Sequence, residues 1–171
     1  MTRIALISTG GTIEKTYEEL AGTLSNRISV LDVMLAQLDL RGTTDITRIA
    51  LMNKDSLEMT DADHARIAEA VEGQLQSHSG VVVVHGTDRL AHSAEITLKR
   101  LQIAGGPRGA VVFTGAMRPW ELRHTDATQN MTEALLAVQI LPPGVYVCMH
   151  NRVLQFPGVH KDPATLTFVK A

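Results

Sequence analysis

Short apolar runs rich in β-branched residues alternate along the chain with longer segments of mixed polarity. Runs of this length and composition are typical of strands buried in a parallel sheet. We therefore expect strands over residues 3–8, 46–52, 81–84, 110–113 and 145–149.

The segments between these runs carry apolar residues at helical spacing. Ser29 is a candidate cap for the first helix, and Thr60 with Asp63 forms a capping box at the start of the second. The expected helices cover residues 30–40, 60–78, 90–103 and 126–141.

Strict alternation of strands and helices predicts an α/β fold. The expected architecture is a doubly wound, mostly parallel sheet with flanking helices in three layers, Rossmann-like or flavodoxin-like. Because no linker, internal repeat or low-complexity run interrupts the pattern, we expect residues 1–171 to form one domain. The polar segment from Glu14 to Ser29 is long enough to be a mobile loop or a loose hairpin that could act as a lid.

Composition narrows the possible partners. The chain has 171 residues, 44% of them hydrophobic and 20% charged, with a formal net charge of −2. A chain with this net charge lacks the excess of basic residues that binds nucleic acid or an acidic membrane surface, so the expected partner is a small molecule. Cys148 is the only cysteine and lies in an apolar run, which indicates a buried thiol and a cytoplasmic location.

Several common chemistries lack their motifs. There is no Gly-x-Ser-x-Gly elbow, no His-Glu-x-x-His pair and no Gly-x-x-x-x-Gly-Lys-Ser/Thr loop in the sequence. The seven histidines are scattered and are interpreted as surface or satisfied core residues. We therefore expect neither a metal nor a cofactor.

Two threonine turns each follow an apolar run directly. They are Thr9-Gly10-Gly11-Thr12 and His85-Gly86-Thr87-Asp88. Ligands of open α/β sheets bind beyond the carboxyl ends of the strands, and glycine lets the backbone approach a ligand closely. This arrangement suits a hydroxyl nucleophile with an oxyanion site, although each turn alone could simply cap a helix.

A threonine hydroxyl is a weak nucleophile and needs a base. Asp88 follows Thr87 directly, and Lys161 lies just past the last expected strand. Glu14, Tyr17 and Glu58 belong to other turns that are expected at the same edge of the sheet.

At these residues the chain resembles the bacterial-type L-asparaginase and glutaminase family. Five family motifs occur in order: Thr-Gly-Gly-Thr-Ile at 9–13, Asp-Ser-x-Asp/Glu-Met-Thr at 55–60, His-Gly-Thr-Asp at 85–88, Thr-Gly-Ala-Met-Arg-Pro at 114–119, and the lysine at 161 after an Asn-x-Val-Leu stretch. Together they cover nearly the whole chain and are far more specific than any one of them.

The resemblance implies an amidohydrolase that acts in asparagine catabolism. Thr12 would attack the side-chain amide of L-asparagine, and Thr87 would be the second catalytic threonine, held with Asp88 and Lys161. Tyr17 is the expected loop tyrosine. Ser56 would bind the substrate α-carboxylate and Asp88 its α-amino group, and the remaining expected substrate contacts are Gly11, Asp55, Gly86, Thr87 and the main chain of Ala116.

Two departures from the family pattern modify this expectation. Members of the family that the chain resembles carry a smaller C-terminal domain after the lysine, which we expect to be absent here, and Leu57 stands where a polar residue is common. In the family that domain supplies an acidic residue across a subunit interface. We expect weaker substrate affinity or a replacement carboxylate, Glu14, Glu18 or Glu58, and a homo-oligomer, either a dimer or a tetramer.

Three other functions stay open from the sequence. The chain could be an amidotransferase-like subunit that releases ammonia for an aminoacyl-tRNA, a non-catalytic amino-acid-binding or regulatory module, or a nucleotide-binding domain. Asparagine and glutamine differ by one methylene, a discrimination of about 1–3 kcal/mol, so weak glutaminase activity is also expected.

Overall fold

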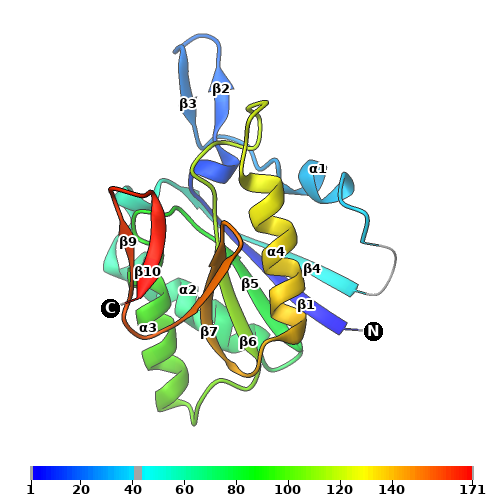
Figure 1. The fold of residues 1–171 in the computed structure, drawn as a ribbon, viewed down its shortest axis with the longest axis vertical. Coiled ribbons are helices and arrows are strands. Elements are labelled where there is room, and N and C mark those ends of the chain that lie inside the picture. Colours follow the sequence, from blue (N-terminus) through cyan, green and yellow to red (C-terminus); the bar gives the residue numbers. More distant parts are fainter. Residues whose placement is uncertain (1, 41–43, 171) are drawn as a thin grey trace.

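Parallel strands form the centre of the molecule (Figure 1). The computed structural model describes residues 2–40 and 44–170. The main sheet has the order β4-β1-β5-β6-β7-β8, and only β8 runs antiparallel to its neighbour. Its strands are β1 (Thr2–Gly10), β4 (Thr44–Lys54), β5 (Gly80–Val84), β6 (Ala110–Thr114), β7 (Gly144–Met149) and β8 (Arg152–Gln155).

Helices cover both faces of this sheet, as expected for three layers. Successive strand residues point to opposite faces, so Ala5 and Ile7 belong to one core cluster while Ile4 and Leu6 belong to the other. The first cluster lies under α2 (Asp61–Gln74) and α3 (Leu90–Ile103), and the second under α1 (Leu31–Ala36) and α4 (Ala127–Ile140). The α/β fold class predicted from the sequence is confirmed.

The strand order reverses between β1 and β5. The next parallel strand after β1 along the chain, β4, pairs with one side of β1, and the following one, β5, pairs with its other side. Such a switch point opens a crevice at the carboxyl ends of the two strands, where ligands of doubly wound folds bind. The hydroxyl of Thr9 donates to the carbonyl of Val84 at 2.9 Å and ties these strand ends together.

The polar segment after β1 folds as a hairpin, one of its two predicted forms. A single turn of 3-10 helix, η1 (Thr12–Glu14), leads into β2 (Thr16–Glu18), which pairs antiparallel with β3 (Thr23–Ser25). In Figure 1 this hairpin projects beyond the end of the main sheet. It therefore stands over the crevice edge rather than in a packed layer.

The prediction for the first helix was wrong in length and in its cap. The helix α1 ends at Ala36 rather than residue 40, and Val30 takes the N-cap position without a side-chain cap. Ser29 precedes the N-cap; its hydroxyl donates to the Glu14 carboxylate at 2.5 Å, and its oxygen accepts a long bond, 3.4 Å, from the N–H of Leu31 at the helix start. Leu38 and Leu40 pack against the core beyond the helix end, which favours an irregular path there.

The other predicted elements differ only at their ends. The strand expected over residues 46–52 extends over Thr44–Lys54. The helix α2 begins with the predicted Thr60–Asp63 capping box, but it ends at Gln74 rather than at residue 78. The helix α3 has the expected bounds.

The end of the chain is more structured than the sequence predicted. Residues His150 and Asn151 have φ of 54° and 59°, as a tight hairpin turn requires, and return the chain along β7 as β8. A further hairpin follows, β9 (Val159–Asp162) with β10 (Thr167–Lys170). Lys161 therefore lies within a strand, not in a tail past the last one. These strands are short and polar, so they lack the apolar signal of the central sheet.

The described helices, none longer than 14 residues, include none that is long and apolar enough to cross a membrane. Cys148 is buried in β7, and burial together with the charge of Glu133 raises the pKa of its thiol to about 11. A thiol that stays protonated is unreactive, which agrees with its interpretation as a small core residue.

Candidate active site

The two threonine turns lie backbone against backbone at the switch point. A Cβ added to Gly11 would lie 2.4 Å from the backbone nitrogen of Gly86, and Gly11 itself has a φ of +81°. Only glycine permits both the close approach and this conformation. The contact therefore brings Thr12, in η1, and Thr87, after β5, to one place, as the sequence predicted.

Thr87 is part of a hydrogen-bonded triad. The ammonium of Lys161, in β9, donates to Thr87 Oγ1 at 2.9 Å and to Asp88 Oδ1 at 2.7 Å. Thr87 is buried, whereas Asp88 is exposed. The triad thus presents a fixed hydroxyl from the interior and a carboxylate that a ligand can reach.

Ser56 lies directly against the second turn. It opens η2 (Ser56–Glu58), the 3-10 turn after β4, and is almost fully buried. A Cβ on Gly86 would lie 2.5 Å from its hydroxyl oxygen. That hydroxyl has no hydrogen-bond partner within the described residues. Because buried polar groups are normally paired, the unpaired hydroxyl is a position at which a ligand can bind.

Asp55 forms the wall beside Ser56. Its carboxylate accepts from Lys15 at 2.7 Å and from the Leu57 N–H at 3.0 Å. These two bonds, the one from Lys15 first, lower the pKa of Asp55. Asp55 is therefore an ionised group that joins the base of the hairpin to the end of β4.

A cavity of about 370 Å³ opens between the hairpin base and the end of β4. Asn26, in its wall, donates to the carbonyl of Gly11 at 2.8 Å and to Asn53 Oδ1 at 3.1 Å. The role of Asn26 in supporting the first turn was not predicted, because a lone Asn in a polar segment carries no motif. The full lining is Lys15, Leu24, Ser25, Asn26, Asn53, Lys54, Asp55 and Glu58.

The turn after β6 forms the third side of the site. A Cβ on Gly115 would lie 2.3 Å from the carbonyl oxygen of His85, so this turn packs directly on the second one. Ala116 is buried there, and Thr87 Oγ1 lies 3.7 Å from the sulfur of Met117. The main chain of Ala116 thus lies beside the second threonine turn, as the family motif implies.

Asp126 holds this third turn and was missed by sequence reasoning. Its carboxylate accepts from the backbone N–H groups of Met117 and Arg118, both at 2.9 Å, and from His150 at 2.7 Å. Burial raises the pKa of Asp126, but these hydrogen bonds outweigh burial and lower it overall. From the sequence, Asp126 was predicted only to begin a helix.

The three candidate replacement carboxylates have different surroundings. Glu14 is buried and accepts from the Gly10 N–H and the Ser29 hydroxyl. Burial raises its pKa in spite of these bonds. Glu18 lies 3.4 Å from Arg27 in an ion pair. Glu58 is exposed and lines the cavity beside Asp55, so it is the one of the three that a ligand there could meet.

Tyr17 lies on the projecting hairpin with 55% of its surface exposed. Its backbone N–H donates to the Glu121 carboxylate at 2.5 Å. Within the described residues no hydrogen bond joins its side chain to Thr12 or Thr87. Its role as the loop tyrosine therefore stays a prediction.

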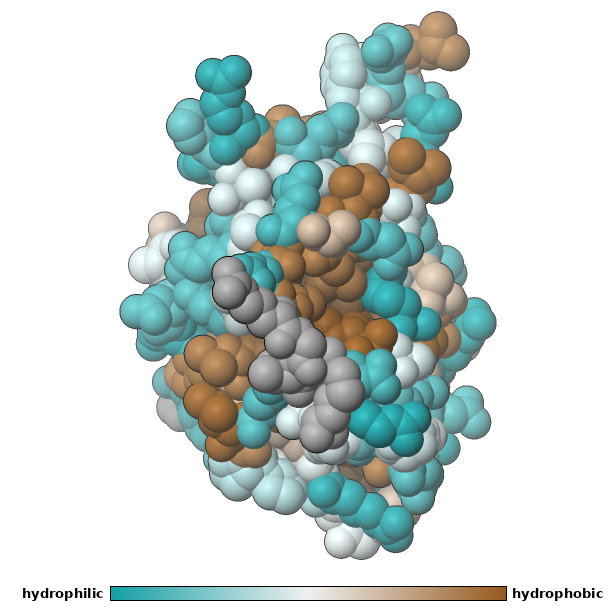
Figure 2. Space-filling model, turned by 90° about the vertical axis from the view of Figure 1, so that its right-hand side faces the viewer, coloured by the Kyte–Doolittle hydropathy of each residue, from teal (hydrophilic) through white to brown (hydrophobic). Residues whose placement is uncertain are grey.

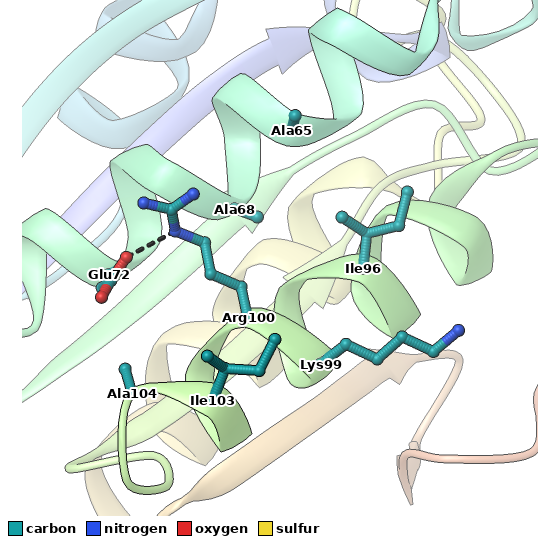
Figure 3. Close-up of a pocket in the computed structure, with 8 residues that line it drawn as sticks. All are labelled: Ala65, Ala68, Glu72, Ile96, Lys99, Arg100, Ile103 and Ala104. Atoms are coloured by element: carbon teal, nitrogen blue, oxygen red, sulfur yellow. Dashed lines mark hydrogen bonds and ion pairs between the residues drawn. The ribbon is translucent and has the colours of Figure 1, made fainter.

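A larger and more apolar pocket lies elsewhere. Figure 3 shows it between α2 and α3, where the Arg100 side chain reaches across to Glu72. Its volume is about 590 Å³, and no residue of the threonine turns lines it. Within residues 2–40 and 44–170 no group of three or more His, Cys, Asp or Glu side chains could hold a metal ion.

Comparisons with known proteins agree on one family. The family model "Asparaginase, N-terminal" matches residues 3–166. The chain is 34% identical over 148 residues to a glutamyl-tRNA(Gln) amidotransferase subunit of Haloquadratum walsbyi, covering 86% of this chain and 33% of that protein. It is 28% identical over 160 residues to the L-asparaginase of Thermococcus kodakarensis, covering 93% and 47%.

Solved structures agree in fold. The structure of the thermostable L-asparaginase from Thermococcus kodakarensis superposes with a TM-score of 0.84 at 26% identity, covering 98% of this chain and 51% of that one. An L-asparaginase I from Vibrio cholerae, at 22% identity, has a TM-score of 0.81 and shares the fold. The chain thus spans about a third to a half of the length of these relatives.

Proposed function

Because the chain belongs to the asparaginase family, we propose that it is an L-asparaginase, which hydrolyses L-asparagine to L-aspartate and ammonia. We propose that all the groups for this reaction lie within the described residues. The observation that carries the proposal is the contact between the two threonine turns, with Thr87 held by Lys161 and Asp88.

The polar groups around the two threonine turns suit an α-amino acid, although they lie beside the cavity at the hairpin base rather than in its lining. The exposed Asp88 carboxylate can accept hydrogen bonds from the α-ammonium group, and the unpaired Ser56 hydroxyl can donate to the α-carboxylate. These contacts direct the side-chain amide toward the two threonines. Asp55, already bonded to Lys15 and to the Leu57 N–H, acts through the position of Ser56 rather than by direct contact.

Thr12 Oγ attacks the amide carbonyl carbon and gives its proton to Thr87 Oγ1, which passes its own proton to the leaving nitrogen, while the Lys161 ammonium holds Thr87 and Asp88. Ammonia leaves when the C–N bond breaks, which produces an ester between Thr12 and the substrate side chain. Water then attacks this ester, which releases L-aspartate and restores the Thr12 hydroxyl. The oxyanion would be stabilised by backbone N–H groups of the turns at Thr12, Gly86 and Ala116, since the Gly11 N–H already donates to the carbonyl of Lys54 at 2.9 Å.

Ammonia release from L-asparagine tests the proposal, with L-glutamine assayed in parallel. The Thr12→Ala variant removes the nucleophile and is expected to lose at least about 10³-fold in kcat, whereas Thr12→Ser keeps a hydroxyl and retains more activity. Circular dichroism of each variant checks its folding. A folded wild-type chain that binds L-aspartate but releases no ammonia would favour the amino-acid-binding module instead.

The similarity to amidotransferase proteins favours a second candidate function. In that case the same threonine pocket would release ammonia for transfer to glutamyl-tRNA(Gln). Free asparaginase activity that needs neither tRNA nor a partner protein supports the hydrolase. Ammonia release that appears only when a partner protein and charged tRNA are added supports the amidotransferase.

We also propose a cytoplasmic homo-oligomer. Figure 2 shows a band of apolar side chains on the face that carries α1. On α1 and α4, Val33, Leu136 and Ile140 are each more than half exposed. A subunit contact would cover such residues. A monomer mass measured by light scattering over a wide concentration range would contradict the oligomer. Cell fractionation tests the cytoplasmic location.

A further inference from the structure

Three buried polar side chains connect the second threonine turn to the helices behind it. His64 is on α2, Ser93 is on α3 and His85 begins the turn after β5, and each is at most 2% exposed. Ser93 Oγ lies 2.7 Å from His64 Nδ1 and 2.7 Å from His85 Nε2. His85 Nδ1 lies 2.8 Å from the carbonyl oxygen of Gly86. The chain of hydrogen bonds therefore ends on the backbone of the turn.

The chemistry of these groups gives every bond a direction. A carbonyl oxygen only accepts, so His85 must carry its proton on Nδ1. In a neutral ring Nε2 then only accepts, and its donor is the Ser93 hydroxyl. Ser93 Oγ in turn accepts from the Nδ1–H of His64. One tautomer of each ring satisfies the whole chain.

Burial favours this neutral arrangement. Desolvation lowers the pKa of His85 to about 4 and also lowers the pKa of His64. The imidazole of His85 is therefore uncharged near neutral pH and keeps one donor and one acceptor. A neutral ring in this position cannot reverse its bonds without leaving one of its nitrogens unpaired.

The bond to Gly86 orients a peptide that matters for catalysis. The carbonyl of Gly86 and the N–H of Thr87 belong to one planar peptide and point in opposite directions. Fixing the carbonyl toward His85 therefore fixes the Thr87 N–H away from it. Within the described residues that N–H has no acceptor, while the Thr87 hydroxyl is held by Lys161. Gly86 has no side chain of its own that could hold the peptide in place.

We propose that His85 is a positioning residue, which orients the Gly86–Thr87 peptide through its Nδ1–H and is itself held by Ser93 and His64. Its effect is to keep the Thr87 N–H and hydroxyl aligned with the reacting carbonyl. The catalytic part of this inference rests on the proposed hydrolysis of L-asparagine. The hydrogen-bond geometry does not, and the two parts can be tested separately.

Two conservative variants separate the two ring nitrogens. His85→Asn keeps an N–H at the position of Nδ1 but cannot reach Ser93, whereas His85→Gln reaches Ser93 but has no donor at the position of Nδ1. We expect His85→Gln to lose about 100-fold in kcat, comparable to the loss of one oxyanion donor, with KM changed less than about 3-fold. We expect the kcat of His85→Asn to be at least about 10-fold higher than that of His85→Gln.

Nitrogen-15 NMR provides a readout that needs no activity. The wild-type chain is expected to show His85 and His64 protonated on Nδ1 at pH 7, and the Thr87 amide resonance to shift in His85→Gln but much less in His85→Asn. A pair of variants that lose kcat equally, or a His85 ring protonated on Nε2, would overturn the proposal. If the wild-type chain releases no ammonia, the proposed function fails, and the amide shifts alone decide the positioning role.

Discussion

The His85–Asp88 turn and the β2–β3 hairpin both border the candidate site, but the fold holds them very differently. The turn is buried at His85 and Thr87, and bonds from Ser93 and Lys161 hold it on two sides. The hairpin exposes Leu20 completely and Tyr17 by 55%. The candidate catalytic groups of the turn are thus held firmly, while the hairpin is weakly attached.

The boundary between the two regions lies at the base of the hairpin. Glu14 is buried against Gly10 and Ser29, and Lys15 pairs with Asp55. Beyond Lys15, the hydrogen bond from the Tyr17 N–H to the Glu121 carboxylate lies on the exposed surface. Motion of the hairpin about this base would leave Thr12 in place, because η1 belongs to the fixed side.

The largest expected effect is in the fixed region, at Thr87 and Lys161. Thr87→Val keeps the shape of the buried side chain without its hydroxyl, and Lys161→Met removes the ammonium that holds it. Each is expected to lower kcat on L-asparagine by about 10³-fold, and the double variant hardly further, because the groups act as a unit. Steady-state kinetics measures this, with the exposed Lys99→Met as control. Additive losses would contradict the coupling.

The next effect is on the pH dependence of stability. An unfolded His85 binds a proton near pH 6.5, but the native ring does so only at about pH 4. The unfolded state therefore binds more protons between these values, and the free energy of unfolding is expected to fall by about 3 kcal/mol as the pH drops from about 6.5 to about 4.

Urea unfolding of the wild type and of His85→Asn at several pH values isolates this contribution. The difference between the two curves removes the effects of His64, whose lowered pKa acts in the same direction, and of Glu14, whose raised pKa acts in the opposite one. Parallel curves for the two proteins would show that the native ring titrates normally.

A smaller effect is expected from the hairpin itself. If Tyr17 closes over the substrate, Tyr17→Phe should lower kcat by about 10-fold, less than the roughly 10²–10⁴-fold typical of a general acid or base. Bound L-aspartate should also slow cleavage by a glutamate-specific protease at Glu18 and Glu19, on this hairpin. Unchanged kcat together with unchanged cleavage would assign no catalytic role to Tyr17.

The smallest effect is expected from the ion pair at the hairpin base. Lys15 and Asp55 are about one quarter exposed, so a double-mutant cycle of Lys15→Met and Asp55→Asn should give a coupling of about 0.5–1 kcal/mol in unfolding free energy. Lys54 and Asp63, at 3.0 Å with side chains 44% and 13% exposed, form a comparison pair of similar mean exposure and should couple by a similar amount. A coupling of zero for Lys15 and Asp55 alone would mean that this pair does not anchor the base of the hairpin.

The apolar pattern was sufficient for the central strands and for α2, α3 and α4. Val81–Val84 is fully buried, and the Thr60–Asp63 capping box begins α2 as predicted. The pattern failed where tertiary contacts replaced local signals. Val30 rather than Ser29 takes the N-cap of α1, because the Ser29 hydroxyl binds Glu14. The strand β9, which carries Lys161, is short and polar.

By itself the sequence determined the layered α/β fold and the five motifs, because strand burial, helix caps and glycine turns act over neighbouring residues. Only the tertiary structure decided which groups meet: Gly11 against Gly86, Lys161 on Thr87 and Asp88, and the unpaired Ser56 beside them. It also revealed the path from His64 through Ser93 to His85. Such contacts join residues up to 75 positions apart, and hydrogen bonds over that separation leave no periodic trace in the sequence.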